Sequence, residues 1–415
     1  MTGRVSCGPG RRTQYLALQV ILALFLVALA TTVYAGNPKA KPFLPDISQE
    51  WTQVEPEEGF TYNGLAPSCS GCPTCTSSDF YFFVKGGPVN NLVIFLEGGG
   101  ACWDSVNCLY YYTYTQQIPP TTYDSLTDGQ GIFDLTNPEN PFADWNFVYI
   151  PYCTGDVHWG SNDYEYPADG GSWTIRHRGF VNFMAVMSWV TEHFSNPHSI
   201  FVAGSSAGAY GALIAFPYVA EAYPKSKVTL LGDAGNGVIT KNFIDVAPEV
   251  WGAEANIPSW IPGVPSAPPY PLTIIPDMYK SVGEYYDHLK ISQYTTAYDN
   301  NQTFFYNVML NIHDPTLWNN IVPVWCDWHQ GMLENAAISE EALNYRIYVG
   351  AGDIHTILRS DRVYTEDSAG GVRFVDWLDA LVRNQGGTRG HGAMPWMNLE
   401  CTECDEPPVI SCSGP

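Results

Sequence analysis

One serine of this chain stands in a pattern that could do chemistry. The run Gly204-Ser205-Ser206-Ala207-Gly208 matches G-x-S-x-G, which is typical of a nucleophile elbow: a sharp turn that leads from a strand into a helix and exposes the serine hydroxyl. The apolar residues 200–202 before it predict a strand, and the small residues 207–223 after it predict a helix that ends at Pro224. We therefore expect Ser206 to act as a nucleophile.

A serine nucleophile needs a base, and His355 is the best placed of the nine histidines. It follows the apolar stretch 346–349 and a glycine turn. A loop after a strand can bring an imidazole over the elbow, so that one ring nitrogen takes the serine proton and the other faces a carboxylate. The rival is His391 in Gly390-His-Gly, whose surroundings of glycine and cysteine are more typical of a tail.

Four aspartates could supply the carboxylate: Asp233, Asp299, Asp314 and Asp353. Asp233 ends a predicted strand and could reach the site directly. Asp353 stands only two residues from His355, so its side chain should turn away from the ring. Asp299 falls between serine and histidine in the chain, as the usual order requires. It could equally be the N-cap of a helix that begins near Thr303. Position in the chain leaves the choice open.

Acyl transfer also needs amide N–H groups that stabilise an oxyanion. The apolar run 91–96 predicts a strand, and Gly98, Gly99 and Gly100 follow it. Such a loop lets backbone amides approach a ligand without interference from side chains, and the N–H of Ala207 would be the second arm of the hole. A phosphate cradle or a plain turn is the alternative. The missing lysine and the spacing argue against a phosphate-binding P-loop.

Strands and helices alternate along the rest of the chain. Apolar runs predict strands at 80–84, 92–96, 147–150, 200–203, 228–231 and 346–349. One-sided apolar patterns predict helices at 180–194 and 374–382. This alternation is typical of an α/β fold with a mostly parallel sheet that is covered by helices on both faces. We expect one large domain with long loop insertions.

The N-terminal residues look like a secretory signal. Three arginines precede an uncharged apolar run of about 15 residues, which is too short to span a bilayer well, and small residues at 33 and 35 suit cleavage after Ala35. The predicted division is a signal peptide at 1–35, an extension at 36–61, a catalytic domain at 62–385 and a cysteine-containing tail at 386–415. We expect a secreted protein without a stable membrane anchor.

The charge of the chain excludes one class of partner. It has 42 acidic against 19 basic residues and a formal net charge of −23. An acidic surface repels phosphate backbones, so we expect no nucleic-acid partner.

Ten cysteines remain after Cys7 of the signal. An even number in an exported chain predicts up to five disulfides. The alternative is a zinc site built from Cys69, Cys72 and Cys75 with Cys401 and Cys404, which have ligand-like spacing.

Several blocks together resemble the pectin acetylesterase family, which includes the secreted carboxylesterase Notum. These blocks are Leu96-Glu-Gly-Gly-Gly-Ala-Cys-Trp, Pro151-Tyr-Cys-Thr-Gly-Asp, Gly204-Ser-Ser-Ala-Gly-Ala, Ala297-Tyr-Asp-Asn-Asn-Gln and the later strand, glycine turn and histidine. The resemblance runs from about 62 to about 382. One departure is that Ala101 and Cys102 follow the glycines, where family members usually have an aromatic residue.

The resemblance implies an α/β-hydrolase domain with serine esterase chemistry and no cofactor or metal. It implies Ser206 as nucleophile, Asp299 as acid and His355 as base, with Gly99, Gly100 and Ala207 as donors of the oxyanion hole. It further implies a disulfide between Cys102 and Cys108 beside the hole.

The sequence allows three functions, of which two are esterase functions and one is a binding function. The resemblance favours removal of O-acetyl groups from a pectin-like extracellular or cell-wall polysaccharide. The alternatives are removal of a longer acyl chain from a protein or lipid, and a non-catalytic hydrolase-fold protein that binds a glycan or a partner. The oligomeric state is not predicted.

Overall fold

In a computed structural model of the chain, the structure describes residues 44–383, 396–402, 404 and 412. The expected signal peptide at 1–35 and the rival His391 lie outside the described residues. No helix within the described ranges combines the length and the apolar character that crossing a membrane requires.

The core of the fold is a nine-stranded sheet with the order β1-β2-β4-β3-β7-β8-β9-β10-β11. All pairings from β4 to β11 are parallel, whereas β2 pairs antiparallel with both β1 and β4. The strands are β1 Thr52–Val54, β2 Phe82–Lys85, β3 Asn91–Leu96, β4 Asn146–Ile150, β7 Ser199–Ser205, β8 Lys227–Asp233, β9 Lys290–Thr296, β10 Tyr345–Gly350 and β11 Leu399–Glu400. The predicted mostly parallel sheet is confirmed.

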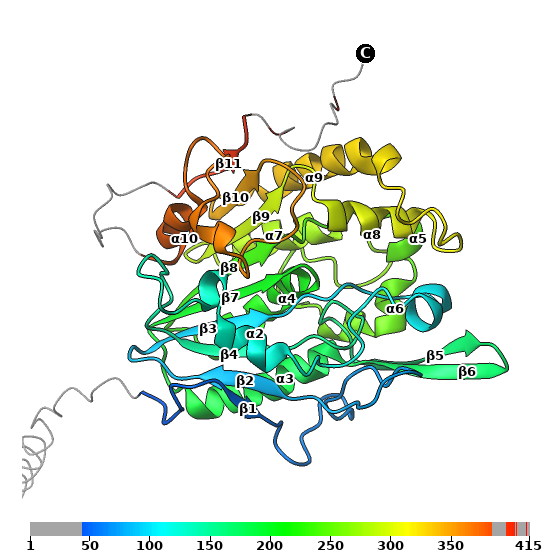
Figure 1. Cartoon of the computed structure of the whole chain (residues 1–415), viewed down its shortest axis with the longest axis horizontal. Coiled ribbons are helices and arrows are strands. Elements are labelled where there is room, and N and C mark those ends of the chain that lie inside the picture. The colour runs from blue at the N-terminus through cyan, green and yellow to red at the C-terminus, as the bar shows by residue number, and fades with distance from the viewer. Residues whose placement is uncertain (1–43, 384–395, 403, 405–411, 413–415) are drawn as a thin grey trace, which may run out of the picture. The chain divides into compact units, whose positions relative to one another are not determined.

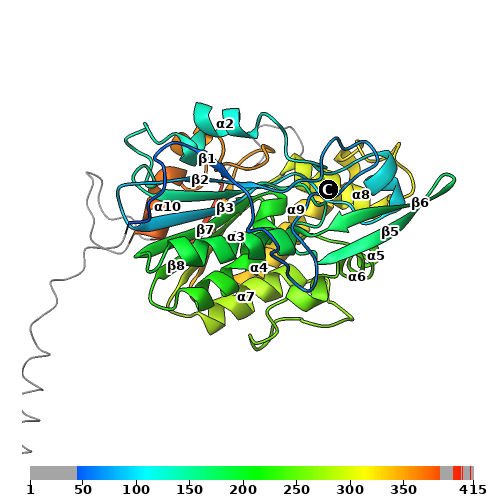
Figure 2. The ribbon, with the colours of Figure 1, turned by 90° about the horizontal axis from the view of Figure 1, so that it is seen from below.

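Helices cover both faces of this sheet (Figures 1 and 2). On β3, Leu92, Ile94 and Leu96 pack in the core below α3, α4 and α7, while Val93 and Phe95 face the core that includes α10. The helices are α2 Thr122–Asp128, α3 Gly179–His193, α4 Ala207–Ala222, α5 Lys241–Ile244, α6 Ala247–Trp251, α7 Ile274–Tyr285, α8 Asn300–Leu310, α9 Trp325–Ser339 and α10 Phe374–Val382. Short helical turns are η1 Val106–Tyr110, η2 Gly131–Phe133, η3 Ala253–Asn256, η4 Val322–Val324 and η5 Asp361–Tyr364.

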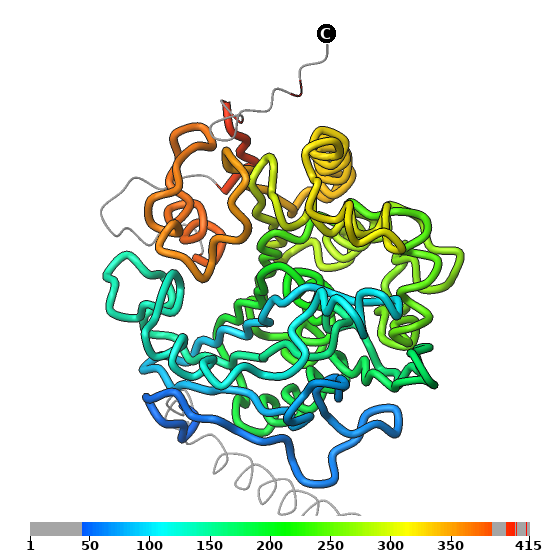
Figure 3. The backbone as a smooth tube through the Cα atoms, turned by 45° about the vertical axis from the view of Figure 1, so that its right-hand side comes forward, coloured from blue at the N-terminus to red at the C-terminus, as the bar shows by residue number. Residues whose placement is uncertain are grey.

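The two ends of the described chain lie at opposite edges of the sheet. Strand β1 comes from the segment predicted as an N-terminal extension, and β11 comes from the segment predicted as a tail. They form the first and the last strand of the same sheet. Figure 3 shows the blue N-terminal segment and the red C-terminal segment on opposite sides of the intervening strands.

All six predicted strands and the three predicted helices are present, and the structure contains further elements that were not predicted from the sequence. Strand β9 has the sequence Lys-Ile-Ser-Gln-Tyr-Thr-Thr and is almost entirely buried. Its buried polar side chains are paired: the Gln293 amide donates to the Gly235 carbonyl, and the Tyr345 hydroxyl donates to Gln293. A separate antiparallel hairpin joins β5 Asn162–Ala168 and β6 Gly171–His177.

Five disulfides join the ten cysteines that follow the predicted signal, and this confirms the expectation from their even number. The pairs are Cys69–Cys153, Cys72–Cys75, Cys102–Cys108, Cys326–Cys412 and Cys401–Cys404. The Cys102–Cys108 bridge is the one that the resemblance implied. The zinc alternative is wrong, because a disulfide sulfur is not the thiolate that zinc requires.

Candidate active site

Ser206 occupies a strained turn at the end of β7 and the start of α4. Its backbone has φ 59° and ψ −122°, a conformation that a non-glycine residue adopts only when its surroundings enforce it. The amide of Ser206 donates to the Asp233 carbonyl at 2.7 Å. The Ser206 side chain makes no capping hydrogen bond to the helix. The hydroxyl is therefore displayed beside the helix N-terminus, as in a nucleophile elbow.

The structure brings Asp299 and His355 together. The Nδ1 of His355 lies 2.8 Å from each carboxylate oxygen of Asp299, which is fully buried. The Nε2 of His355 is buried and has no hydrogen-bond partner among the described residues. Both His355 and Ser206 line the same pocket. One ring nitrogen is thus held by a carboxylate, and the other is free for a proton.

Opposing effects act on the pKa of His355. Burial favours the neutral ring and lowers this pKa, whereas the charge of Asp299, its hydrogen bond and the charge of Asp233 raise it. The raising effects are the larger, so the pKa lies above its ordinary value. This environment favours the imidazolium that forms when the ring accepts a proton.

Asp299 is at once the N-cap of α8 and the partner of the histidine. Its carboxylate accepts from the Gln302 amide N–H at 2.9 Å and from the Gln302 side chain at 3.0 Å. Gln302 in turn accepts from the Asn236 amide at 2.8 Å. The N-cap considered for Asp299 from the sequence is therefore present together with the contact to His355, and the helix cap fixes the direction of the carboxylate.

The other candidate acids make different contacts. Asp314 is exposed and hydrogen-bonds to Thr316. Asp353 is partly buried, and its carbonyl accepts from the Asn300 amide. Asp233 is fully buried, and its carboxylate binds Ser205 and the backbone that follows His355, not the imidazole.

The three glycines after β3 lie beside the elbow. Gly100 has φ 77°, and a Cβ there would lie 2.1 Å from the Thr113 carbonyl, so this position requires glycine. The carbonyl of Gly99 and the amide of Ala101 pair with residues 115 and 113. No acceptor among the described residues takes the amide hydrogens of Gly99, Gly100 or Ala207. Gly100 and Ala207 line the pocket, and Gly99 does not.

Three residues that the sequence analysis did not select hold the glycine loop. The ring Nε2 of buried His158 donates to the Glu97 carbonyl at 2.8 Å, and burial lowers the pKa of His158 to about 4, which keeps this ring neutral. The side chain of Glu97 pairs with Arg359 at 2.9 Å. Arg359 lies four residues after His355, so this ion pair joins the glycine loop to the histidine loop. The signal in the sequence was only that Glu97 adjoins the glycines.

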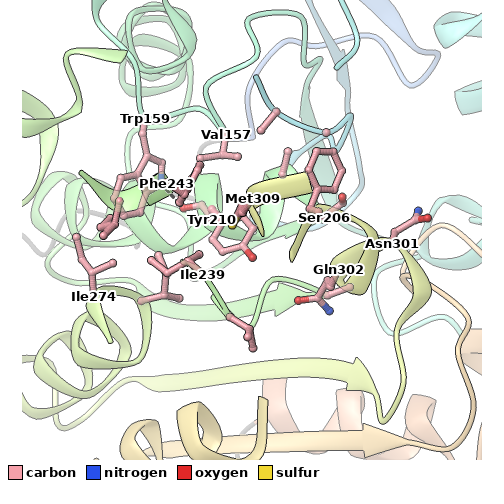
Figure 4. A pocket seen from close by; sticks show the side chains of 18 of the residues that line it. Val157, Trp159, Ser206, Tyr210, Ile239, Phe243, Ile274, Asn301, Gln302 and Met309 are labelled. Atoms are coloured by element: carbon pink, nitrogen blue, oxygen red, sulfur yellow. Dashed lines mark hydrogen bonds between the residues drawn. The ribbon is translucent and has the colours of Figure 1, made fainter. Parts of the chain in front are cut away.

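A pocket extends from Ser206 between α5, α6, α7 and α8 (Figure 4). Most of its wall is apolar: Val157, Trp159, Val238, Ile239, Phe243, Ile244, Pro248, Trp251, Ile274, Ile275, Phe305, Met309 and Trp328. Among the polar side chains, Ser206, His355, Asn301 and Gln302 come from the elbow, the histidine loop and the start of α8, and Tyr210 comes from α4.

One group of possible metal ligands occurs in the described part of the chain. It consists of Cys102, Cys108 and His177. The two cysteines share a disulfide, and the ring of His177 is bonded to Tyr166 and to the Thr154 carbonyl. The group therefore offers no thiolate and no free imidazole nitrogen to a metal.

Comparisons with known proteins find one family and several relatives that are similar to part of the chain. A family model described as Pectinacetylesterase matches residues 70–246, a range that contains Gly99, Gly100 and Ser206 and ends before Asp299 and His355. The palmitoleoyl-protein carboxylesterase NOTUM of Mus musculus is 31% identical over 156 residues, which is 34% of this chain and 29% of that protein. Pectin acetylesterase 11 of Arabidopsis thaliana is 29% identical over 164 residues, which is 38% of this chain and 41% of that protein. The matches thus span less than half the length of either relative.

A solved structure shares the fold. The Wnt deacylase Notum from Drosophila aligns with a TM-score of 0.53 and 17% identity, over 76% of this chain and 89% of that one. The family match, the relatives and the shared fold lead to one conclusion: residues 70–246 are similar to the pectinacetylesterase family, and the chain has an α/β-hydrolase-like fold.

Proposed function

We propose that this protein is a carboxylesterase in which Ser206 is the nucleophile, His355 the general base and Asp299 the acid. The observation that carries the proposal is the contact between Nδ1 of His355 and the buried Asp299, with Nε2 left free in the pocket that Ser206 lines. A carboxylate on one ring nitrogen fixes the tautomer in which the other nitrogen can accept a proton.

In the first half of the reaction, Oγ of Ser206 attacks the ester carbonyl carbon while Nε2 of His355 takes the hydroxyl proton. The carbonyl oxygen gains the negative charge. The imidazolium then gives its proton to the leaving alcohol oxygen as the carbon–oxygen bond breaks. An acyl group remains on Ser206.

In the second half, water replaces the alcohol. His355 takes a proton from the water, whose oxygen attacks the acyl carbon, and the proton returns to Oγ as the carboxylic acid leaves. Ser206 is regenerated, and no redox partner is needed.

The amides of Gly99, Gly100 and Ala207 are the proposed oxyanion donors. They are unpaired within the described structure, and Ala207 is the first residue of α4, whose N-terminus favours negative charge. Loss of one such donor typically costs about 3 kcal/mol of transition-state stabilisation.

The pocket favours an acyl chain longer than acetyl. An acetyl group buries one methyl group, and the apolar wall between Trp159 and Met309 offers far more surface. Each methylene that enters such a wall gains about 0.8 kcal/mol, which corresponds to about fourfold in kcat/KM. This observation supports the alternative in which the enzyme removes a longer acyl chain. The O-acetyl polysaccharide substrate expected from the sequence stays a prediction.

Export is part of the proposal. Five disulfides form in the described chain, and disulfides persist in oxidising compartments. This supports a secreted enzyme and agrees with the signal peptide expected at 1–35.

The test compares p-nitrophenyl esters of two to twelve carbons and acetate release from acetylated pectin and xylan. We expect turnover by the wild type that rises with chain length, and none by Ser206→Ala. The matched control is Ser172→Ala, on the exposed hairpin, which should keep full activity. Turnover that persists in Ser206→Ala would remove the nucleophile assignment, and a maximum at acetyl would remove the longer acyl chain.

A further inference from the structure

Asp233 is a second buried carboxylate at the site, and the proposed reaction gives it no role. It is the last residue of β8 and lies in register with Ser205 at the end of β7. Its exposed fraction is 0%. No ion pair to Asp233 occurs within the described part of the chain. A buried carboxylate without a cation is costly, so its contacts should explain its presence.

The carboxylate of Asp233 accepts hydrogen bonds from two sides of the site. From the elbow, the hydroxyl of Ser205 donates to Oδ2 at 2.5 Å. From the histidine loop, the amides of Ile357 and Leu358 each donate at 3.0 Å. One side chain thus ties the residue before the nucleophile to the backbone that follows His355.

The main chain of Asp233 adds a third tie. Its carbonyl accepts from the amide of Ser206 itself at 2.7 Å. Ser206 and the loop that carries His355 are therefore both hydrogen-bonded to Asp233, although they lie about 150 positions apart in the chain. Such a connection fixes the relative placement of two groups that have to exchange a proton.

We propose that Asp233 is a positioning residue that holds His355 at the proper distance from Ser206 and stabilises the imidazolium during turnover. This inference rests on the proposed function. Asp299 binds the ring directly, whereas Asp233 acts through the loop backbone and through its charge.

The charges around His355 agree with this role. The two acidic groups that raise the pKa of His355 are Asp299 and Asp233. Burial raises the pKa of Asp233 above its ordinary value, although the hydrogen bonds from Ser205, Leu358 and Ile357 and the charge of His355 act in the lowering direction. Burial raises the pKa of Tyr294, and the charge of Asp233 acts in the same direction.

The test uses Asp233→Asn, which keeps the size of the side chain and removes its charge. We expect kcat to fall at least tenfold with KM within twofold of the wild type. We also expect the acid limb of the kcat/KM profile to move to lower pH, because one of the two charges that favour the protonated ring is gone. The matched control is the exposed Asp314→Asn, which should change neither quantity.

A purely structural role would leave the pH of the acid limb unchanged, so an unshifted limb in folded Asp233→Asn overturns the proposal, as does an unchanged kcat. Should this variant not fold, Ser205→Ala decides, since it removes one donor and keeps the charge. We expect it to lower kcat three- to tenfold without moving the acid limb, and an unchanged kcat would overturn the positioning role. Activity in Ser206→Ala would instead mean that the proposed function itself had failed.

Discussion

Gly208 packs directly against the main chain of Leu96, and a Cβ on Gly208 would lie 1.9 Å from the Leu96 carbonyl oxygen. This contact joins the start of α4 to the end of β3, so it sets the distance between the nucleophile and the glycine loop. No side chain is small enough to replace glycine here without a backbone shift.

We predict that Gly208→Ala lowers the free energy of unfolding by about 1–3 kcal/mol and lowers activity by separating the elbow from the hole. The matched control is Gly171→Ala, where a Cβ would meet nothing within 4 Å and φ is not positive. Urea unfolding measures both variants. Equal stability of the two would show that the close approach is not a constraint.

Asp299→Asn should lower kcat by roughly 10⁴-fold, as the loss of the triad carboxylate does in serine proteases. Asparagine is nearly as good an N-cap as aspartate, so α8 should remain intact and the loss should be chemical. Steady-state kinetics measure the loss of kcat in Asp299→Asn, and circular dichroism shows whether the variant keeps the helix content of the wild type. If Asp233→Asn lost more activity than Asp299→Asn, the acid would have to be reassigned.

The pH profile should reflect the raised pKa of His355. The neutral ring is the base, so activity should rise as the imidazolium loses its proton, with a midpoint above the ordinary value of about 6.5. The raised pKa also stabilises the fold: this contribution is complete below the unfolded pKa and is lost as pH rises through the folded pKa. A kcat/KM profile whose acid limb has its midpoint below the ordinary pKa of histidine would contradict the raised pKa of His355.

The disulfides should contribute unequally to stability. Cys69 and Cys153 are 84 residues apart, whereas Cys102 and Cys108 are six apart. Loop-closure entropy in the unfolded chain then predicts that the long loop adds about 4.6 kcal/mol to the free energy of unfolding and the short loop about 2 kcal/mol. Double cysteine-to-alanine variants, compared by thermal unfolding, should keep this ranking. The reverse ranking would mean that contacts within the short loop dominate.

Much of the fold was predictable because buried strands appear in the sequence as short, continuous apolar runs. The residues 200–202 and 346–349 belong to strands that lead to Ser206 and His355. Strand β9 was not predictable in this way, since its polar residues are buried by pairing with distant partners such as Gly235 and Tyr345. The signal for the hairpin β5–β6 was present in Asp169-Gly170, a typical turn dipeptide, and was missed.

The site was less predictable than the fold. Position in the chain did not decide which of four aspartates contacts the histidine. That contact depends on the geometry of the loops, which no local sequence pattern encodes. The contact from His355 to Asp299 and the ties from Asp233 appear only when β8 and β9 lie side by side. The ion pair between Glu97 and Arg359 spans 262 residues and had no sequence signal beyond the acidic residue beside the glycines.

The most direct test of the account is the site of labelling by a fluorophosphonate probe, located by mass spectrometry of the digested protein. We predict one adduct, on Ser206, and strongly slowed labelling in His355→Ala. A wild-type protein that folds and remains unlabelled, or that carries the adduct on another serine, would contradict it.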